Sequence, residues 1–189
     1  MAGDGLHLFS DDDETEAPEV AKPTEEVPEE TQEKKEQFLI EEQRYLLFSI
    51  GDTVFSTKLM EIREVISMVD YQSVPNTKPH FLGMANIRGE VVGLLDACSM
   101  LGVQPLENQD KSAIIIFDTE HGALGIKVNE VYGVREIPLG SIDDLPQVDS
   151  VVPQKYMQGI AKLDDKLVAV VELRNLLSDE DMVLIKKVS

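Results

Sequence analysis

The stretch GMANIRGEVVGLLD, residues 83–96, decides how the rest of the chain is interpreted. Small residues lead into Asn-Ile-Arg-Gly, and Gly89 offers a turn position at which a positive φ costs little. The run Val91–Leu95 then has the length and apolar character of a strand. This order predicts a tight β-hairpin with Arg88 beside its tip.

A near-copy of this hairpin returns as GIAKLDDKLVAVVE, residues 159–172, at a constant offset of 76 positions. Small residues and strand residues recur in both copies. The second copy carries Asp164-Asp165 where the first carries Arg88-Gly89. The hairpin itself therefore does not require an arginine at its tip.

A second alignment precedes each hairpin, at an offset of 69. KLMEIREV at 58–65 corresponds to KVNEVYGV at 127–134, and each follows a pair of predicted strands joined by a turn, within 45–57 and 113–126. Residues 58–66 predict a turn of helix that runs into a strand. The chain thus contains two copies of one strand-rich unit, about 44–102 and 112–177. About five short strands in each predict a mainly β fold of two pseudo-symmetric small barrels packed together.

Short helices and loops complete the prediction. Residues 97–102 predict a helical turn that glycine ends, whereas 138–155 are rich in proline and aspartate and predict a loop. At the C-terminus, residues 178–187 predict a helix. Ser178 can cap it, acidic residues follow in its first turn, and two lysines lie near its end.

Charge divides the chain into two parts. Residues 1–37 hold 13 acidic residues and 3 lysines, a net charge of −10, so residues 38–189 account for the remaining −9 of the total of −19. The first part has too little apolar surface to offset the entropy of ordering, which predicts a disordered acidic tail ahead of a domain over 38–189. Leu6–Phe9 is the one apolar segment in this tail, and it is either a short docking peptide or an unremarkable terminus.

The same numbers exclude several function classes. A net charge of −19 opposes nonspecific binding to nucleic acid or to an anionic membrane surface. The sequence contains no run of 18 apolar residues that could span a membrane. The N-terminus also lacks the basic-then-apolar order of a signal peptide. A single cysteine, Cys98, cannot form an intrachain disulfide. We therefore expect a cytoplasmic protein.

No catalytic set is found in the sequence. His7, His80 and His121 lack metal-ligand spacing and are expected to be ordinary surface residues, so no metal or other cofactor is expected. Cys98 follows an apolar strand and is expected to be a packed thiol. Phosphate-binding glycine motifs and Gly-x-Ser-x-Gly are absent. The chain is expected to act by binding and not as an enzyme.

Arg88 and Glu64 are the leading candidates for binding. Arg88 is either an ordinary exposed arginine or a rigidly held donor suited to a partner's carboxylate or backbone carbonyls. Glu64 corresponds to Gly133 in the second copy. Because the second copy lacks this charge, the repeated unit does not need it for its structure.

At these residues the sequence resembles the CheW-like domain, the family of the bacterial chemotaxis coupling protein. FLGMANIRGEVVGLLD at 81–96 carries the resemblance, supported by EIREV at 61–65, Asn76-Thr77 and YMQGI at 156–160. The similarity covers about 44–183. Gly93, Ala97-Cys98 and the acidic tail depart from the family's usual pattern.

The resemblance implies two SH3-like five-stranded barrels around a shared hydrophobic core. It also implies a non-catalytic adaptor that joins the cytoplasmic tips of methyl-accepting chemoreceptors to the regulatory domain of a histidine kinase, at membrane-associated arrays. In the family a groove between the barrels takes the receptor tip. Carried over by position, the receptor-side residues are Ile62, Glu64, Gly83, Asn86, Arg88 and Gly89. The kinase-side surface has no sharp motif and its residues stay unassigned.

Three alternatives remain at this point. The chain could serve another receptor–kinase cluster, such as one driving twitching or gliding motility. It could be a small-molecule sensor that uses the cleft between the barrels. The acidic tail could itself be the active part, as a mimic that competes for a basic partner surface.

Overall fold

The computed structural model describes residues 44–107, 109–144, 153–178 and 181, and the predicted tail at 1–37 lies outside them. The strands are β1 (Arg44–Ile50), β2 (Thr53–Lys58), β3 (Glu64–Ser67), β4 (Phe81–Ile87), β5 (Glu90–Asp96), β6 (Ala113–Thr119), β7 (Gly122–Val128), β8 (Glu130–Glu136), β9 (Ile142–Asp143), β10 (Met157–Leu163) and β11 (Lys166–Val171). The short helices are η1 (Leu59–Glu61), α2 (Ala97–Leu101), η2 (Leu139–Ser141), η3 (Gln154–Tyr156) and η4 (Leu173–Leu176).

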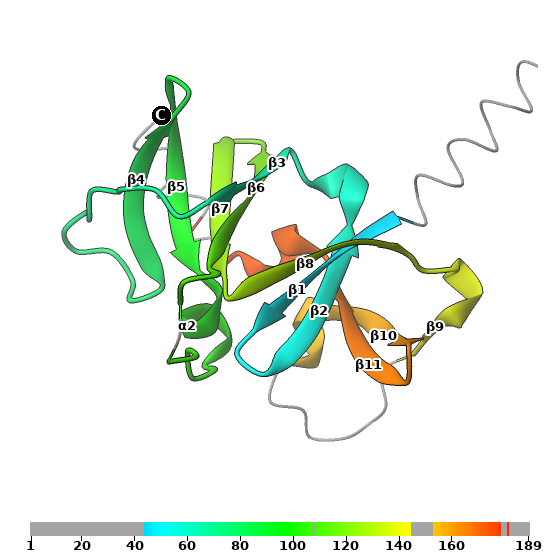
Figure 1. Cartoon of the computed structure of the whole chain (residues 1–189). Coiled ribbons are helices and arrows are strands. Elements are labelled where there is room, and N and C mark those ends of the chain that lie inside the picture. The colour runs from blue at the N-terminus through cyan, green and yellow to red at the C-terminus, as the bar shows by residue number, and fades with distance from the viewer. Residues whose placement is uncertain (1–43, 108, 145–152, 179–180, 182–189) are drawn as a thin grey trace, which may run out of the picture.

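The strands form two sheets that lie side by side (Figure 1). One has the order β8-β1-β2-β11-β10-β9 and is called barrel A here; the other has the order β3-β6-β7-β5-β4 and is called barrel B. The edge strands of barrel B share one interior, because Ile66 of β3 and Ile87 of β4 both pack into the cluster that contains Ile114 and Ile116. The predicted mainly β fold of two small barrels is confirmed.

Neither barrel coincides with one sequence repeat. β3, which belongs to the first repeat, pairs with β6 in barrel B, and β8, from the second repeat, pairs with β1 in barrel A. The ranges 44–102 and 112–177 therefore delimit the repeats and not two separately built barrels. The exchange follows from η1, which turns the chain away from β2 before β3 begins.

A shared hydrophobic core joins the barrels. Barrel A contributes Phe48 and Phe55, whose stacked rings have centroids 6.1 Å apart, and barrel B contributes Phe81 and Phe117 to the same buried cluster. Cys98 of α2 lies in this core, as the sequence predicted for a packed thiol. The core predicted by the family resemblance is therefore present.

The local predictions hold at α2 and differ in the loop before β10. The Asp96 carboxylate accepts the Ser99 backbone N–H at 3.0 Å to cap α2, and Gly102 ends it with φ +68°. Within 138–155, predicted as a loop, the structure contains η2, the start of η3 and the two-residue strand β9, which pairs with β10 through Asp143 and Ile160. Proline and aspartate frequencies do not reveal a strand this short.

Ser178 and Asp181 contact the loop before β4. Most of the helix predicted at 178–187 lies outside the described residues. Ser178 and Asp181 nevertheless form reciprocal cap bonds, since the Asp181 carboxylate accepts from the Ser178 N–H at 2.8 Å and the Ser178 hydroxyl accepts from the Asp181 N–H at 3.4 Å. His80 Nε2 lies 2.7 Å from Asp181 Oδ1. The prediction of an ordinary surface histidine is thus wrong for His80.

Asp181 is only 2% exposed, so its ionisation state bears on stability. Burial raises the pKa of its carboxyl, but hydrogen bonds from Ser178 and His80 outweigh burial and hold the pKa below its ordinary value of 3.8. A lowered pKa in the folded state means that ionised Asp181 stabilises the fold above this value. The contribution is lost as the pH falls through the lowered pKa.

We predict that Asp181→Asn lowers the free energy of unfolding by about 1–3 kcal/mol near neutral pH, because a charged acceptor of two partners is lost. The difference from the unchanged protein should shrink at an acidic pH well below 3.8, as the pH falls through the lowered pKa and Asp181 itself becomes protonated. Denaturant unfolding at both pH values measures this. A difference that stays constant between them would contradict the assigned role.

Gly83 lies at a close approach of two backbones. It has φ +150°, and Met84 beside it exchanges backbone hydrogen bonds with Gln72, each 2.8 Å long. A Cβ at Gly83 would collide with the backbone carbonyl of Gln72 and would meet Ser73 Cα at 3.0 Å. The glycine therefore lets the loop before β4 lie directly on that strand.

Gly83→Ala should lower the free energy of unfolding by about 1–3 kcal/mol through backbone strain, before any loss from displacing the loop. Gly140→Ala is the matched control, because a Cβ there meets nothing within 4 Å and no positive φ is required. Thermal unfolding of both variants makes the comparison. Equal stability of the two would show that the loop does not need this close approach.

Candidate functional site

The β4–β5 hairpin turns within two residues. Ile87 pairs with Glu90, so Arg88 and Gly89 form the whole turn, and their φ values are +53° and +91°. Positive φ at both positions is the pattern of a type I′ turn, which suits the twist of a two-residue hairpin. The Asn86 side-chain oxygen accepts the Gly89 N–H at 2.9 Å and fixes the turn. Arg88 is thus in the tip itself, and the predicted hairpin is confirmed.

Arginine is a costly residue at this position. A left-handed backbone costs a residue with a Cβ about 1–2 kcal/mol, and asparagine or glycine would fit the turn better. The Arg88 guanidinium gains one ion pair, at 3.2 Å from Glu64, while its side chain remains 79% exposed. An exposed pair of this kind contributes about 0–1 kcal/mol. Local stability therefore does not account for an arginine at position 88.

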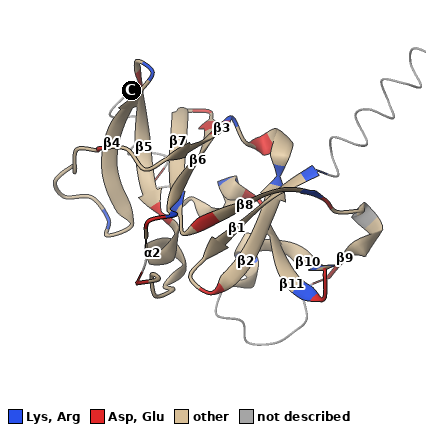
Figure 2. Cartoon of the chain, viewed as in Figure 1, with Lys and Arg blue, Asp and Glu red and all other residues tan. Residues whose placement is uncertain are grey.

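Three further charged residues surround this pair. Arg63 contacts Glu90 at 2.6 Å and Asp118 at 3.2 Å, so the β3, β5 and β6 strands converge on one set of charges. We call Arg63, Glu64, Arg88, Glu90 and Asp118 the ion-pair cluster. Figure 2 shows the opposite charges at the turn between β4 and β5.

The electrostatics of the cluster agree with its geometry. The hydrogen bond from Arg63 lowers the pKa of Glu90, and the same bond is the main cause of the raised pKa of Arg63. Both side chains are about two-fifths exposed, which limits the stabilisation that the pair can supply. The cluster holds Arg88 at one end of barrel B without saturating it, so the guanidinium can still donate to a partner.

Barrel A lacks this cluster although it has the same hairpin. Leu163 pairs with Lys166 around Asp164 and Asp165, whose φ values are +47° and +63°. The turn geometry is thus common to both copies and the arginine is not. At the position of Glu64 the second copy has Gly133 in β8. The structure supports the inference that neither charge is needed to build the fold.

A groove of about 630 Å³ lies between the barrels and begins one residue after Glu64. It is lined by Val65–Met68 of β3 and its exit, by 109–113, and by Glu130 and Val131 of β8. Val65 is 39% exposed in it, and Lys111 pairs with Glu130 at 2.7 Å. β3 therefore connects the ion-pair cluster to the inter-barrel groove.

A second hollow, of about 390 Å³, lies beside β4 of the hairpin. Asn86 lines it together with two exposed apolar side chains, Tyr71 at 41% and Val91 at 50%. Arg88 is thus flanked by polar and apolar surface of the kind found in protein interfaces.

The six residues expected on the receptor side do not all lie on one accessible surface. Asn86, Arg88 and Gly89 are exposed at the turn, and Glu64 is joined to them through Arg88. Ile62 is half-buried and packs against the shared core, and Gly83 is buried beneath the loop before β4. Gly83 therefore supports the site from within.

Sequence reasoning missed Arg63, Glu90 and Asp118. The first two were detectable, because Arg63 adjoins Glu64 and Glu90 lies close to Arg88 in the sequence. Two such segments lying together bring opposite charges into contact. Asp118 was not, because its role depends on how β6 lies beside β3.

The described residues show no arrangement that points to covalent or metal chemistry. Burial raises the pKa of the Cys98 thiol, which lies 3.3 Å from the Asn129 side-chain oxygen, so the thiolate is disfavoured. No group of three potential metal ligands occurs in the part of the chain described. Among the same residues, no helix is long and apolar enough to cross a membrane.

Comparison with known proteins agrees with this picture. The Probable chemotaxis protein CheW of Rhizobium etli is 25% identical over 136 residues, which is 72% of this chain and 88% of that protein. The Chemotaxis protein CheW of Klebsiella aerogenes is 22% identical, with 78% and 89% covered. Protein PilI of Pseudomonas aeruginosa is 27% identical, with 60% and 64% covered.

The fold comparison gives the same result. The crystal structure of the scaffolding protein TtCheW from Thermoanaerobacter tengcongensis superposes with a TM-score of 0.67 at 25% identity, covering 74% of this chain and 90% of that one. Residues 44–181 match the family described as the CheW-like domain, which is most of the chain. The chain therefore belongs to the CheW-like domain family, whose members are chemotaxis scaffold and adaptor proteins.

Proposed function

We propose that this protein is a non-catalytic scaffold that couples the cytoplasmic tips of methyl-accepting chemoreceptors to the regulatory domain of a CheA-type histidine kinase. It would act in the cytoplasm, at membrane-associated receptor arrays. The observation that carries the proposal is Arg88, an exposed cation kept at a turn position where its backbone is strained.

The receptor tip would lie along β3, between the ion-pair cluster and the inter-barrel groove. Arg88 would donate to carboxylates or backbone carbonyls of the receptor, and Val65 would supply apolar contact within the groove. Asn86 and Gly89 would hold the turn in the required shape.

Coupling would be geometric. The shared core makes the two barrels one packed unit, so a partner on either barrel has a fixed relation to a partner on the other. A small receptor movement could then bias the kinase without chemistry in the adaptor.

A second candidate is the same adaptor role in another receptor–kinase cluster, such as one driving twitching or gliding motility. The similarity to Protein PilI favours keeping this candidate. A small-molecule sensor is a weaker one, since a charged pair, Lys111 and Glu130, borders the inter-barrel groove. A saturable ligand in a thermal-shift screen would favour it.

Arg88→Asn should weaken receptor pull-down about tenfold or more, as expected for loss of a charged contact at an interface centre. It should leave the melting temperature unchanged or raise it, because asparagine tolerates the positive φ. Asp164→Asn, at the matching turn of barrel A, is the control and should leave receptor binding intact. Loss of stability with binding retained would contradict the proposal.

The charge-swapped double variant Arg88→Glu with Glu64→Arg separates a partner contact from an internal one. It keeps opposite charges at the two positions, whose side chains form an ion pair at 3.2 Å in the unchanged protein. If Arg88 serves the receptor directly, the swap fails to restore binding. Restored binding would assign Arg88 a role within the fold alone.

A further inference from the structure

The apolar interiors of the two barrels are covered to different extents at their corresponding ends. In barrel B, Ile87, Ile116 and Ala123 are at most 9% exposed beneath the ion-pair cluster. By the repeat offsets, their counterparts in barrel A are Leu163, Leu47 and Val54, and these are only half-buried. Barrel A therefore has an incompletely covered apolar interior at this end.

An opening of about 290 Å³ is the result. Its lining residues, called the barrel A mouth here, are Leu47, Val54, Tyr132, Arg135, Leu163, Asp164, Lys166 and Val168. Tyr132 stands at the position of Arg63 and is 49% exposed, and the adjoining Leu167 is 69% exposed, so large apolar side chains face solvent here.

Two buried hydroxyls on the same strand faces support this description. Ser49 and Ser56 share their faces with Leu47 and Val54, are at most 3% exposed, and have no hydrogen-bond partner among the described residues. In barrel B the counterpart of Ser49 is Asp118, which is exposed and pairs with Arg63. The interior of barrel A is thus open at this end and contains two hydroxyls without a hydrogen-bond partner.

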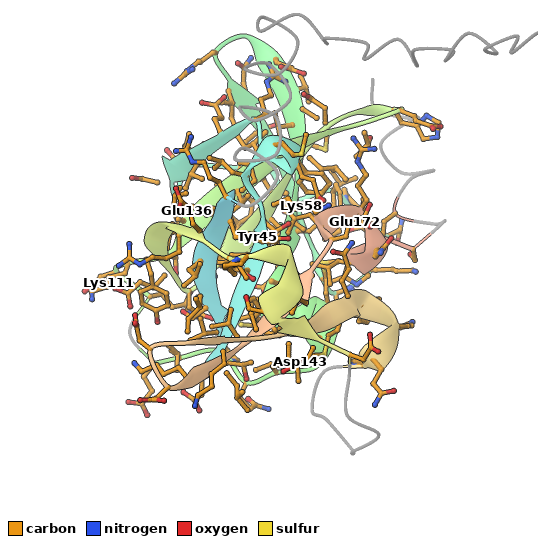
Figure 3. All side chains as sticks on the ribbon, turned by 90° about the vertical axis from the view of Figure 1, so that its right-hand side faces the viewer. Tyr45, Lys58, Lys111, Glu136, Asp143 and Glu172 are labelled. Atoms are coloured by element: carbon orange, nitrogen blue, oxygen red, sulfur yellow. The ribbon has the colours of Figure 1, made fainter. Side chains whose placement is uncertain are left out.

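The rim of the mouth carries two basic side chains and one acidic one, Asp164, in a protein that is acidic overall. Arg135 and Lys166 line it and make no ion pair with an acidic side chain in the described part of the chain, whereas Lys162 is already paired with Asp165 at 3.0 Å. In the β1–β8 register Tyr45 lies opposite Arg135, and the next residue, Arg44, lies opposite Glu136. Figure 3 views barrel A from its outer side, where Lys58, Glu136 and Asp143 are arranged around Tyr45 in projection.

The chain's own N-terminal segment has the complementary chemistry. Leu6, Leu8 and Phe9 are apolar, and after Ser10 come four acidic residues, Asp11–Glu14. The segment joins the structure at Arg44, three residues before Leu47 of the mouth. The 34 residues between Phe9 and Arg44 would span about 30 Å as a flexible chain, which is enough to return to the end of β1.

We propose that Leu6–Phe9 docks in the barrel A mouth of its own chain, with Asp11–Glu14 against Arg135 and Lys166. The segment would cover the open apolar interior of barrel A, as the ion-pair cluster covers the interior of barrel B. It would also shield the exposed Tyr132 and Leu167, so that any partner of this face must displace it. The proposal does not depend on the receptor role of Arg88.

A spin label on the full-length chain tests this. Ser10→Cys provides the attachment site, since Cys98 is buried and its thiol pKa is raised, and mass spectrometry checks that one label is bound. Amides of Tyr132–Arg135 and Leu163–Val168 should lose more than half of their NMR intensity. Those of Asn86–Val91, at the matching end of barrel B, should keep theirs.

Paired variants identify the contacts. Leu8→Ser with Phe9→Ser, and separately Arg135→Glu with Lys166→Glu, should restore the lost intensity. Lys155→Glu with Arg174→Glu makes the same charge change away from the mouth and should leave the broadening in place. Added salt should weaken the effect.

Two results would overturn the proposal. One is uniform intensity across both barrel ends, which would show that the segment does not dock there. The other is broadening of the mouth amides in an isotope-enriched chain that carries no label when it is mixed with a spin-labelled chain, because the occupant would then be a second copy.

Discussion

The core shared by the two barrels is the constraint on which the rest of the structure depends. β1 and β2 present one face to the interior of barrel A and the other to the shared core, so both faces must be apolar or small. Phe48 and Phe55 on the shared face are fully buried, and Tyr45 on the other face is 1% exposed. Because β3 and β8 each cross to the other barrel, neither barrel can form from one repeat alone. The chain is therefore a single packed unit, which is what a scaffold needs to hold two partners in a fixed relation.

The two copies share their strand and turn geometry, and they differ in the side chains exposed at the ends of the barrels. Both hairpins use the same two-residue turn with positive φ, yet one turn carries Arg88 and the other Asp164. The ion-pair cluster covers the end of barrel B, while the corresponding end of barrel A leaves Tyr132 exposed. Comparing the copies separates what the fold requires from what each end adds, which no single barrel could reveal.

Much of this was predictable from the sequence, for identifiable reasons. The hairpin at 83–96, its copy at 159–172 and the helical turn before Gly102 are encoded in local patterns of apolar, turn and capping residues. Strand exchange was not predictable, because an alternating strand such as β3 pairs equally well with either neighbour until the whole core is assembled. The His80–Asp181 contact joins residues 101 positions apart, and no local signal announces it.

Part of the geometry of the candidate site was predictable. Exposure of Arg88, Asn86 and Gly89 followed from the turn, but the burial of Gly83 depends on a loop whose path the sequence does not specify. Ile62 was placed at the site by resemblance and proves to pack on the shared core. Position along a motif thus predicts the neighbourhood of a residue more reliably than its accessibility.

The central claim is that this chain physically links a receptor to a kinase. Co-sedimentation of a CheA-type kinase with receptor-containing membranes tests it most directly. The account predicts that the kinase sediments with the membranes when the full-length chain is added and stays in the supernatant without it. Sedimentation of the kinase to the same extent in both cases, or of the chain with neither partner, would contradict it.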